Sequence, residues 1–208
     1  MSSPAGWPVK LVGELTLHGI APDAQSRRRT PGTTTYGIMG RVEFRDEIDY
    51  PSADVDTVFA MVTDPAFKAA VCEATRPLSH DVALTRGAGG AVEVTVSRTM
   101  PATVPDFAKR FVGDSVVIVQ TESWHARDGD GSRRADLSVV VTGQPARMTG
   151  TMALEPRGSG TRQLITGTVT VSMPFIGALM EPALADGVRS AVDVERRVGV
   201  TWLARRSG

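Results

Sequence analysis

The chain has 208 residues, of which 41% are hydrophobic, and its 23 Lys and Arg residues balance 23 Asp and Glu residues. This length is enough for one well-buried domain, and a net charge of zero gives no electrostatic reason to expect nucleic acid or an anionic membrane surface as a partner. The single cysteine, Cys72, excludes an intrachain disulfide and a zinc site built on cysteines.

Residues 1 to 38 differ in composition from the rest of the chain. They carry four prolines, several glycines and three consecutive arginines, and such a segment buries too little apolar surface to offset chain entropy. We predict a disordered leader here and a folded domain over residues 41 to 206. The alternatives are a short strand from Lys10 to His18 and a translation start at Met39.

We find no targeting or membrane-spanning signal in the sequence. No stretch reaches the ~18 uninterrupted apolar residues of a transmembrane helix. The apolar run from Val9 to Ile20 is interrupted by charged residues, which is not typical of a signal peptide. We therefore expect a cytoplasmic protein with no membrane insertion.

The regular pattern begins with a strand. Val42, Phe44 and Ile48 alternate with charged residues, which is the period of a half-buried strand, and Tyr50-Pro51 ends it. Asp46 continues the apolar side of this strand.

Two short helices are predicted next. Ser52 is a suitable N-cap for the first helix, with Asp54 in its first turn facing the helix dipole. Pro65 suits the first position of the second helix, which runs to about Arg76. We interpret Cys72, on the apolar side of this second helix, as a small buried residue.

After Pro77 the period changes to two, and six further strands are predicted. The first two lie around Val82–Leu84 and Val92–Val96, and the glycine-rich turn 87–90 joins them. An insertion with a helical turn around residues 105–111 follows. The last four strands are predicted at Ser115 to His125, Asp136 to Thr142, Arg147 to Glu155, and Gln163 to Met173. Short connections between strands favour antiparallel pairing.

A long helix is predicted from Ile176 to about Arg205, because the apolar spacing changes there to three and four residues. Its stripe consists of Met180, Leu184, Val188, Ala191, Glu195, Val198 and Trp202. No other predicted element is long enough to cover the apolar face of the sheet. The predicted fold class is therefore α+β: a helix-grip, with a seven-stranded curved antiparallel sheet around a long C-terminal helix and two short helices after the first strand.

Several local strings occur in an order that supports this interpretation: Ile48 to Ser52, Thr63 to Pro65, Val94 to Pro101, Phe111 to Asp114, Thr121 to Trp124, Met173 to Gly177, and Glu195 to Leu203. With the order of elements, they resemble the START-like, or Bet v 1-like, helix-grip superfamily. More narrowly, residues 41 to 205 look like an uncharacterised actinobacterial family, domain of unknown function 2505. The resemblance implies a small-molecule cavity between sheet and helix, since members of the superfamily bind lipids, hormones or polyketides and some are cyclases.

Charged residues on apolar faces are the candidates for contact with a ligand. Arg98 continues the apolar face of its strand, Glu122 shares a face with Trp124, and Glu195 lies on the stripe of the last helix. Because a buried charge is costly unless it is paired, we predict that Arg98 pairs with Glu122 or Glu195 inside or at the mouth of the cavity. Such a cluster would anchor a ligand's polar end or act as an acid–base pair. The alternative is an internal ion pair that only fixes the helix against the sheet.

The predicted cavity residues are Phe44, Phe59, Phe67, Val94, Val96, Arg98, Ile118, Glu122, Trp124, Met152, Val169, Val171, Leu184, Val188 and Glu195.

The sequence carries no strong catalytic signature. Its three histidines do not have metal-ligand spacing, and the Gly-x-Ser-x-Gly frame of a nucleophile elbow is missing. We therefore predict the binding of a small apolar or amphipathic molecule, with no cofactor and no metal. Two alternatives remain: a polyketide cyclase or aromatase that uses Arg98, Glu122 and Trp124, and an interaction domain with a filled core.

Overall fold

The computed structural model describes residues 40–102, 113–172 and 181–206, with the side chains of the last helix described from Asp186 onward. The predicted leader, Met39, the helical turn at 105–111 and the predicted start of the last helix at 176–180 lie outside these residues. In the described part, seven strands form one sheet in the order β1-β7-β6-β5-β4-β3-β2, and every neighbouring pair is antiparallel.

The elements follow the predicted order along the chain. They are β1 (Gly40–Tyr50), α1 (Val55–Val62), α2 (Pro65–Ala74), β2 (Ser79–Arg86), β3 (Val92–Pro101), β4 (Ser115–Trp124), β5 (Arg133–Val141), β6 (Ala146–Arg157), β7 (Gly160–Val171) and α4 (Glu181–Arg206). The glycine-rich turn between β2 and β3 contains a single 3₁₀ turn, Ala88–Gly90. The predicted helix-grip fold is confirmed.

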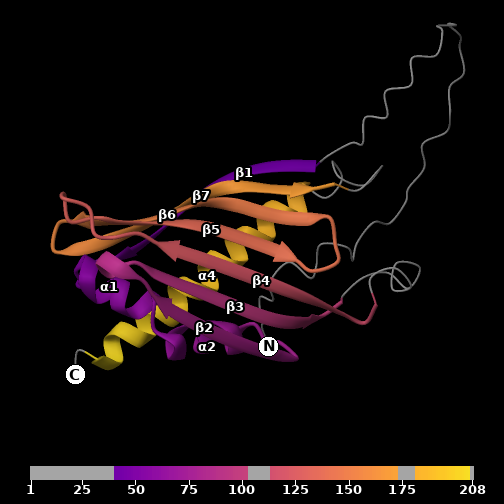
Figure 1. Ribbon diagram of the computed structural model, residues 1–208, viewed down its shortest axis with the longest axis horizontal. Coiled ribbons are helices and arrows are strands. Elements are labelled where there is room, and N and C mark those ends of the chain that lie inside the picture. Colours follow the sequence, from indigo (N-terminus) through magenta and orange to yellow (C-terminus); the bar gives the residue numbers. More distant parts are fainter. Residues whose placement is uncertain (1–39, 103–112, 173–180, 207–208) are drawn as a thin grey trace, which may run out of the picture.

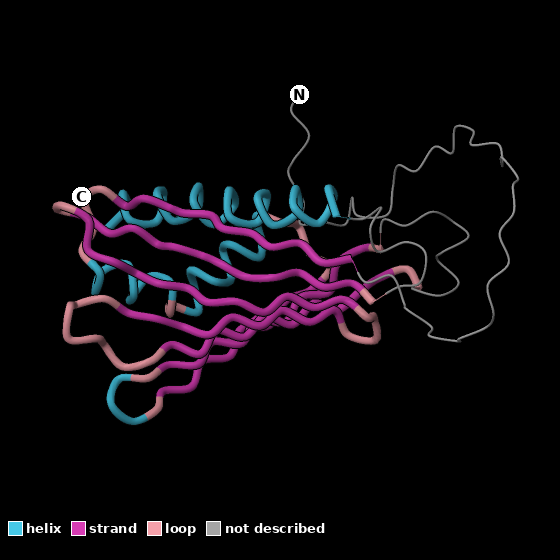
Figure 2. The backbone as a smooth tube through the Cα atoms, turned by 90° about the horizontal axis from the view of Figure 1, so that it is seen from above, coloured by secondary structure: helices cyan, strands magenta, loops and turns pink. Residues whose placement is uncertain are grey.

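The described helices α1, α2 and α4 lie on one side of the curved sheet, and α4 runs along it (Figures 1 and 2). The strands alternate as half-buried strands do: in β3, Val92, Val94, Val96, Arg98 and Met100 are buried and the residues between them are more exposed. The apolar core therefore lies between the concave face of the sheet and the helices.

The start of α1 differs from the prediction. The N-cap is Asp54, whose side chain accepts a hydrogen bond from the Thr57 N–H, rather than Ser52. A turn in which the Ala53 N–H donates to the Tyr50 carbonyl takes up the two residues in between, so the helix starts later. In α2, Pro65 follows the N-cap Asp64 and occupies the first turn, as predicted. The helix ends at Ala74, two residues before the predicted end.

A close approach between Gly199 and Tyr50 sets the position of α4 against β1. A Cβ atom added at Gly199 would lie 2.8 Å from the Tyr50 hydroxyl oxygen, which is closer than packed atoms allow. Glycine at this position lets the helix backbone lie directly on the aromatic ring.

Candidate functional site

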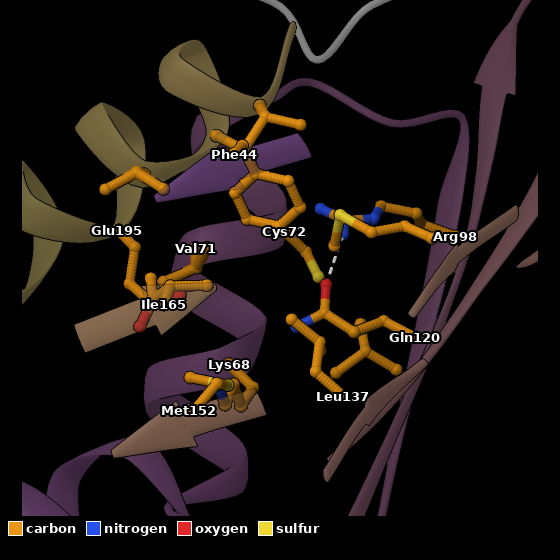
Figure 3. Close-up of a pocket in the computed structure, with 15 residues that line it drawn as sticks. Phe44, Lys68, Val71, Cys72, Arg98, Gln120, Leu137, Met152, Ile165 and Glu195 are labelled. Atoms are coloured by element: carbon orange, nitrogen blue, oxygen red, sulfur yellow. Dashed lines mark hydrogen bonds between the residues drawn. The ribbon is translucent and has the colours of Figure 1, made fainter. Parts of the chain in front are cut away.

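A cavity of about 60 Å³ lies inside the grip, between α2, α4 and the concave face of the sheet (Figure 3). It is lined by Phe44, Lys68, Val71, Cys72, Val96, Arg98, Gln120, Leu137, Met148, Met152, Ile165, Val188, Ala191, Val192 and Glu195. Its volume admits a few water molecules, whereas sites for drug-sized ligands span roughly 300–1,000 Å³. A larger guest therefore requires the walls to move.

The wall of the cavity holds a buried ion pair between α2 and β4. The Lys68 ammonium nitrogen lies 2.6 Å from Oε1 of Glu122, and the two side chains are 3% and 0% exposed. Burial alone would lower the pKa of Lys68, but the carboxylates of Glu122 and Glu195 outweigh this effect and hold that pKa above its ordinary value of 10.5. Lys68 is therefore a charged, buried ammonium at neutral pH.

Two further donors bind the Glu122 carboxylate. Gln120 donates its amide to Oε1 at 2.7 Å, and the Trp124 indole donates to Oε2 at 3.1 Å. The side-chain carbonyl of Gln120 in turn accepts a hydrogen bond from Arg98 at 2.9 Å. The amide of Gln120 thus connects Arg98 to Glu122, and the direct ion-pair partner of Glu122 is Lys68.

Arg98 and Cys72 lie on opposite walls of the cavity, on β3 and α2 (Figure 3). Burial lowers the pKa of Arg98, and Cys72, Glu195 and Glu122 oppose that shift. Burial also raises the pKa of the Cys72 thiol above its ordinary value, although Arg98 and Lys68 act against it. A buried thiol with a raised pKa is protonated at neutral pH, so Cys72 is a poor nucleophile.

Glu195 contributes a second carboxylate to the cavity from α4. Its Oε1 accepts a hydrogen bond of 2.8 Å from the Gln163 amide, and the carbonyl of Gln163 accepts one of 3.4 Å from the Tyr50 hydroxyl. Burial raises the pKa of Tyr50 far above its ordinary value, with the charge of Glu195 adding to the effect. The three side chains connect α4 to the sheet through β1 and β7.

The structure places six of the predicted cavity residues around this space: Phe44, Val96, Arg98, Met152, Val188 and Glu195. Eight others do not line it: Phe59, Phe67, Val94, Ile118, Glu122, Trp124, Val169 and Val171. Phe59 packs edge-on against Trp124, and Phe67 packs edge-on against Trp202. The side chain of Leu184 lies outside the described residues.

Sequence reasoning missed Lys68 and Gln120, the two polar residues at the centre of the network. Lys68 stands three and four residues before Val71 and Cys72, so helical spacing already places it on the apolar side of α2. Gln120 lies two residues before Glu122 and therefore on the same face of β4. Both residues could have been found from the sequence, because each is a polar residue at a position that its helix or strand turns toward the core.

A larger hollow of about 500 Å³ lies outside the grip, between α1, the turn after β1 and the last turns of α4. Its walls are mainly apolar, and Arg206 is the one charged residue among those that the structure places there. A specific binding site differs from a surface groove in having polar groups that converge on one point. The residues that line this hollow do not show such a convergence. The internal cavity is the better candidate.

Within the described ranges, no cluster of three or more His, Cys, Asp or Glu side chains could hold a metal ion. None of the helices in that part of the chain is both long and apolar enough to cross a membrane.

Comparisons with known proteins agree with the fold. Residues 47–203 match the model of a family described as a protein of unknown function, DUF2505. An uncharacterised protein of Mycobacterium tuberculosis is 23% identical over 120 residues, which cover 56% of this chain and 68% of that protein.

Two solved structures with the same fold carry functional names. A STAR-related lipid transfer protein from Xanthomonas axonopodis is 17% identical with a TM-score of 0.52, over 76% of this chain and 85% of that one. The Zhui aromatase/cyclase from Streptomyces sp. R1128 is 12% identical with a TM-score of 0.51, over 82% and 96%. At these identities the likeness concerns the fold alone.

Proposed function

Since the chain belongs to the DUF2505 family and has the START-like helix-grip fold, we propose that it binds a small amphipathic molecule in the cavity between the sheet and α4. A lipid transfer protein and an aromatase/cyclase share this fold, which supports a role of this kind. The proposal depends on the chain's own residues.

One observation carries the proposal: apolar walls and a small set of polar groups meet around the same cavity. Leu137, Met152, Ile165 and Val192 supply apolar surface, while Lys68, Arg98 and Glu195 come from three different elements. A core with only a structural role is best packed with apolar side chains, because buried charges add little or nothing to stability. Several charged side chains around one cavity therefore favour recognition of a ligand.

The walls of the cavity are suited to a change of shape. Met148 and Met152 face it from β6, and methionine side chains repack easily around guests because they are unbranched and flexible. A guest larger than a few water molecules would displace these side chains before it displaced backbone. The small volume also agrees with the alternative of a filled interaction domain, so the experiment must separate the two.

The network argues for binding over the cyclase or aromatase alternative. Of the three polar residues expected to serve such an enzyme, Glu122 and Trp124 hydrogen-bond to each other and do not line the cavity. Glu122 is also held by Lys68 and Gln120, so Glu122 does not present a free carboxylate to a substrate. A general acid or base must come within hydrogen-bond reach of the reacting proton.

The test is a fluorescence titration with N-phenyl-1-naphthylamine, an uncharged dye that brightens in apolar surroundings. The full chain is titrated at pH 7, and binding is followed by emission. We expect saturable binding at one site per chain. An emission change no larger than that of a similar-sized globular protein without a cavity would contradict the proposal and support the filled core.

A further inference from the structure

Two glycines, Gly150 of β6 and Gly167 of β7, are paired with each other in the part of the sheet that borders the cavity. Gly167 is also paired with Phe44 of β1. Leu137 of β5 is the second partner of Gly150. Directly opposite residues of neighbouring strands share one face of a sheet, and Phe44 and Leu137 both line the cavity. The glycine pair therefore lies in the sheet beneath the cavity, where two side chains are missing.

Neither glycine has room for a side chain. A Cβ atom added at Gly150 would collide with the carbonyl oxygen of Thr166. One added at Gly167 would lie 2.6 Å from the carbonyl oxygen of Thr149. Glycine inside a strand often marks a place where another backbone or a ligand approaches closely. The cavity side chains two positions away on the same face of these strands are Met148, Met152 and Ile165. Apolar side chains thus surround a bare patch of backbone.

The ring of Phe44 covers part of this bare backbone. A Cβ atom added at Gly167 would lie 3.0 Å from Cε1 of the ring, so the ring rests on the glycine. In Figure 3 the ring projects from β1 into the space that the cavity residues surround. Phe44 is only partly buried, whereas Ile48 and Tyr50, on the same face of β1, are 0% and 1% exposed. Rotation about the side-chain bonds of Phe44 can therefore move the ring off Gly167 without disturbing the fully enclosed part of the core.

We propose that the apolar part of the ligand lies against Gly150 and Gly167, in the place that the Phe44 ring holds in this structure. The ring moves aside as the ligand enters, so Phe44 controls access to the site. A flat apolar ring of the ligand takes over the contact with the glycine backbone, since the phenyl ring already fits against it. This inference rests on the proposed binding function and names the class of ligand: molecules with a flat apolar ring.

The variant Phe44→Ala tests the inference with N-phenyl-1-naphthylamine, whose rings are flat and apolar. The variant should bind the dye about tenfold more tightly than the unmodified chain, because no ring has to leave the site first. Phe59→Ala is the matched control and should leave the affinity unchanged, since the Phe59 ring packs on Trp124 and does not line the cavity. Unchanged or weaker binding by Phe44→Ala would overturn the inference and leave the proposed function in place.

Two uncharged alcohols of similar carbon number, 2-naphthalenemethanol and 1-decanol, test the class of ligand. Each is used to displace the dye from the unmodified chain. We expect 2-naphthalenemethanol to bind about tenfold more tightly, because a rigid ring fits over the glycines and loses less conformational freedom than a flexible chain. Equal or tighter binding of 1-decanol would contradict the assignment of a flat ring.

A nuclear magnetic resonance measurement on the unmodified chain follows the ring directly. In the free protein, nuclear Overhauser effects should connect the ring protons of Phe44 with the α protons of Gly167. With saturating dye, we expect these effects to disappear and effects between the dye and the Gly167 α protons to replace them. Their persistence in the dye-bound protein would refute the displacement of the ring. If the dye binds neither the unmodified chain nor Phe44→Ala, the proposed function fails and the inference fails with it.

Discussion

The ammonium of Lys68 on α2 and the carboxylate of Glu122 on β4 lie 2.6 Å apart, and both side chains are almost completely buried. The two residues are 54 positions apart in the sequence. Their contact therefore joins the pair of short helices to the middle of the sheet. It also brings two charges out of water, and each then depends on the other.

Removing one partner of this pair leaves the other charge buried and uncompensated. We expect Glu122→Leu to lower the free energy of unfolding by about 3–5 kcal/mol. The double variant Lys68→Met/Glu122→Leu should lose clearly less, because no charge remains buried alone. Urea denaturation followed by circular dichroism measures both.

The exposed ion pair between Asp186 and Arg189 provides the control, since its side chains are 75% and 70% exposed. We expect Asp186→Asn to change the free energy of unfolding by about 1 kcal/mol or less. If Glu122→Leu had an effect as small as that of Asp186→Asn, the buried pair would not have the structural role described here.

Because Gly199 contacts Tyr50, we expect alanine at position 199 to destabilise the protein, the opposite of its usual effect in a helix. Replacing a helical glycine by alanine normally stabilises a helix by up to about 1 kcal/mol. Here the new Cβ would lie 2.8 Å from the Tyr50 hydroxyl oxygen, so we expect Gly199→Ala to destabilise the protein by about 1–3 kcal/mol. Thermal and urea denaturation decide the sign, and stabilisation would show that α4 does not lie directly on the ring.

The order and type of the elements could be predicted because the evidence for them is local. The alternation in β3 is visible in a short stretch of sequence and matches the burial of the structure. The three- and four-residue spacing correctly predicts a helix at α4, although the buried Val192 and Val194 lie off the predicted stripe, of which Val188 is buried. The N-cap of α1 was predicted wrongly as Ser52. Ser52 and Asp54 both have side chains that can cap a helix, and the turn from Tyr50 to Ala53 that moves the helix start to Asp54 is not visible in the local sequence.

The site could be predicted only in part. Arg98, Glu122 and Glu195 were found as charges on apolar faces, and all three belong to the polar network around the cavity. Their partners depend on which elements face one another, so the sequence could not choose Lys68 over Arg98 for Glu122. The volume of the cavity depends on how side chains from several elements fill the space between sheet and helix, and no local pattern contains that information.

The ionisation of Tyr50 should make the stability of the protein depend on pH at high pH. Burial, with the charge of Glu195 adding to it, raises the pKa of Tyr50 in the folded protein well above the ordinary value of 10.0. The unfolded chain therefore releases the phenolic proton first, and this contribution to stability is present below pH 10 and is lost as pH rises above it. Lys68, whose folded pKa is also raised, acts in the same direction.

We expect the free energy of unfolding to fall between about pH 10 and pH 11.5 and to fall less steeply in Tyr50→Phe. Urea titrations at several pH values measure the two slopes. A variant slope equal to that of the unmodified chain would show that Tyr50 ionises as readily in the folded protein as in the unfolded one.

Filling the cavity should block binding. Ala191 lines the cavity from α4, and we expect Ala191→Phe to weaken binding of N-phenyl-1-naphthylamine by about tenfold or more, because the ring occupies the space of the guest. Ala66→Phe, on the exposed side of α2, is the matched control and should bind the dye normally. Unchanged binding in Ala191→Phe would place the dye elsewhere.

The most direct test locates the bound molecule by nuclear magnetic resonance, with the methyl groups of the eight methionines labelled with ¹³C. Met148 and Met152 line the internal cavity, whereas Met61 lines the outer hollow. We expect nuclear Overhauser effects between N-phenyl-1-naphthylamine and the methyl groups of Met148 and Met152. Contacts with Met61 alone would contradict the account, because they would place the guest outside the grip.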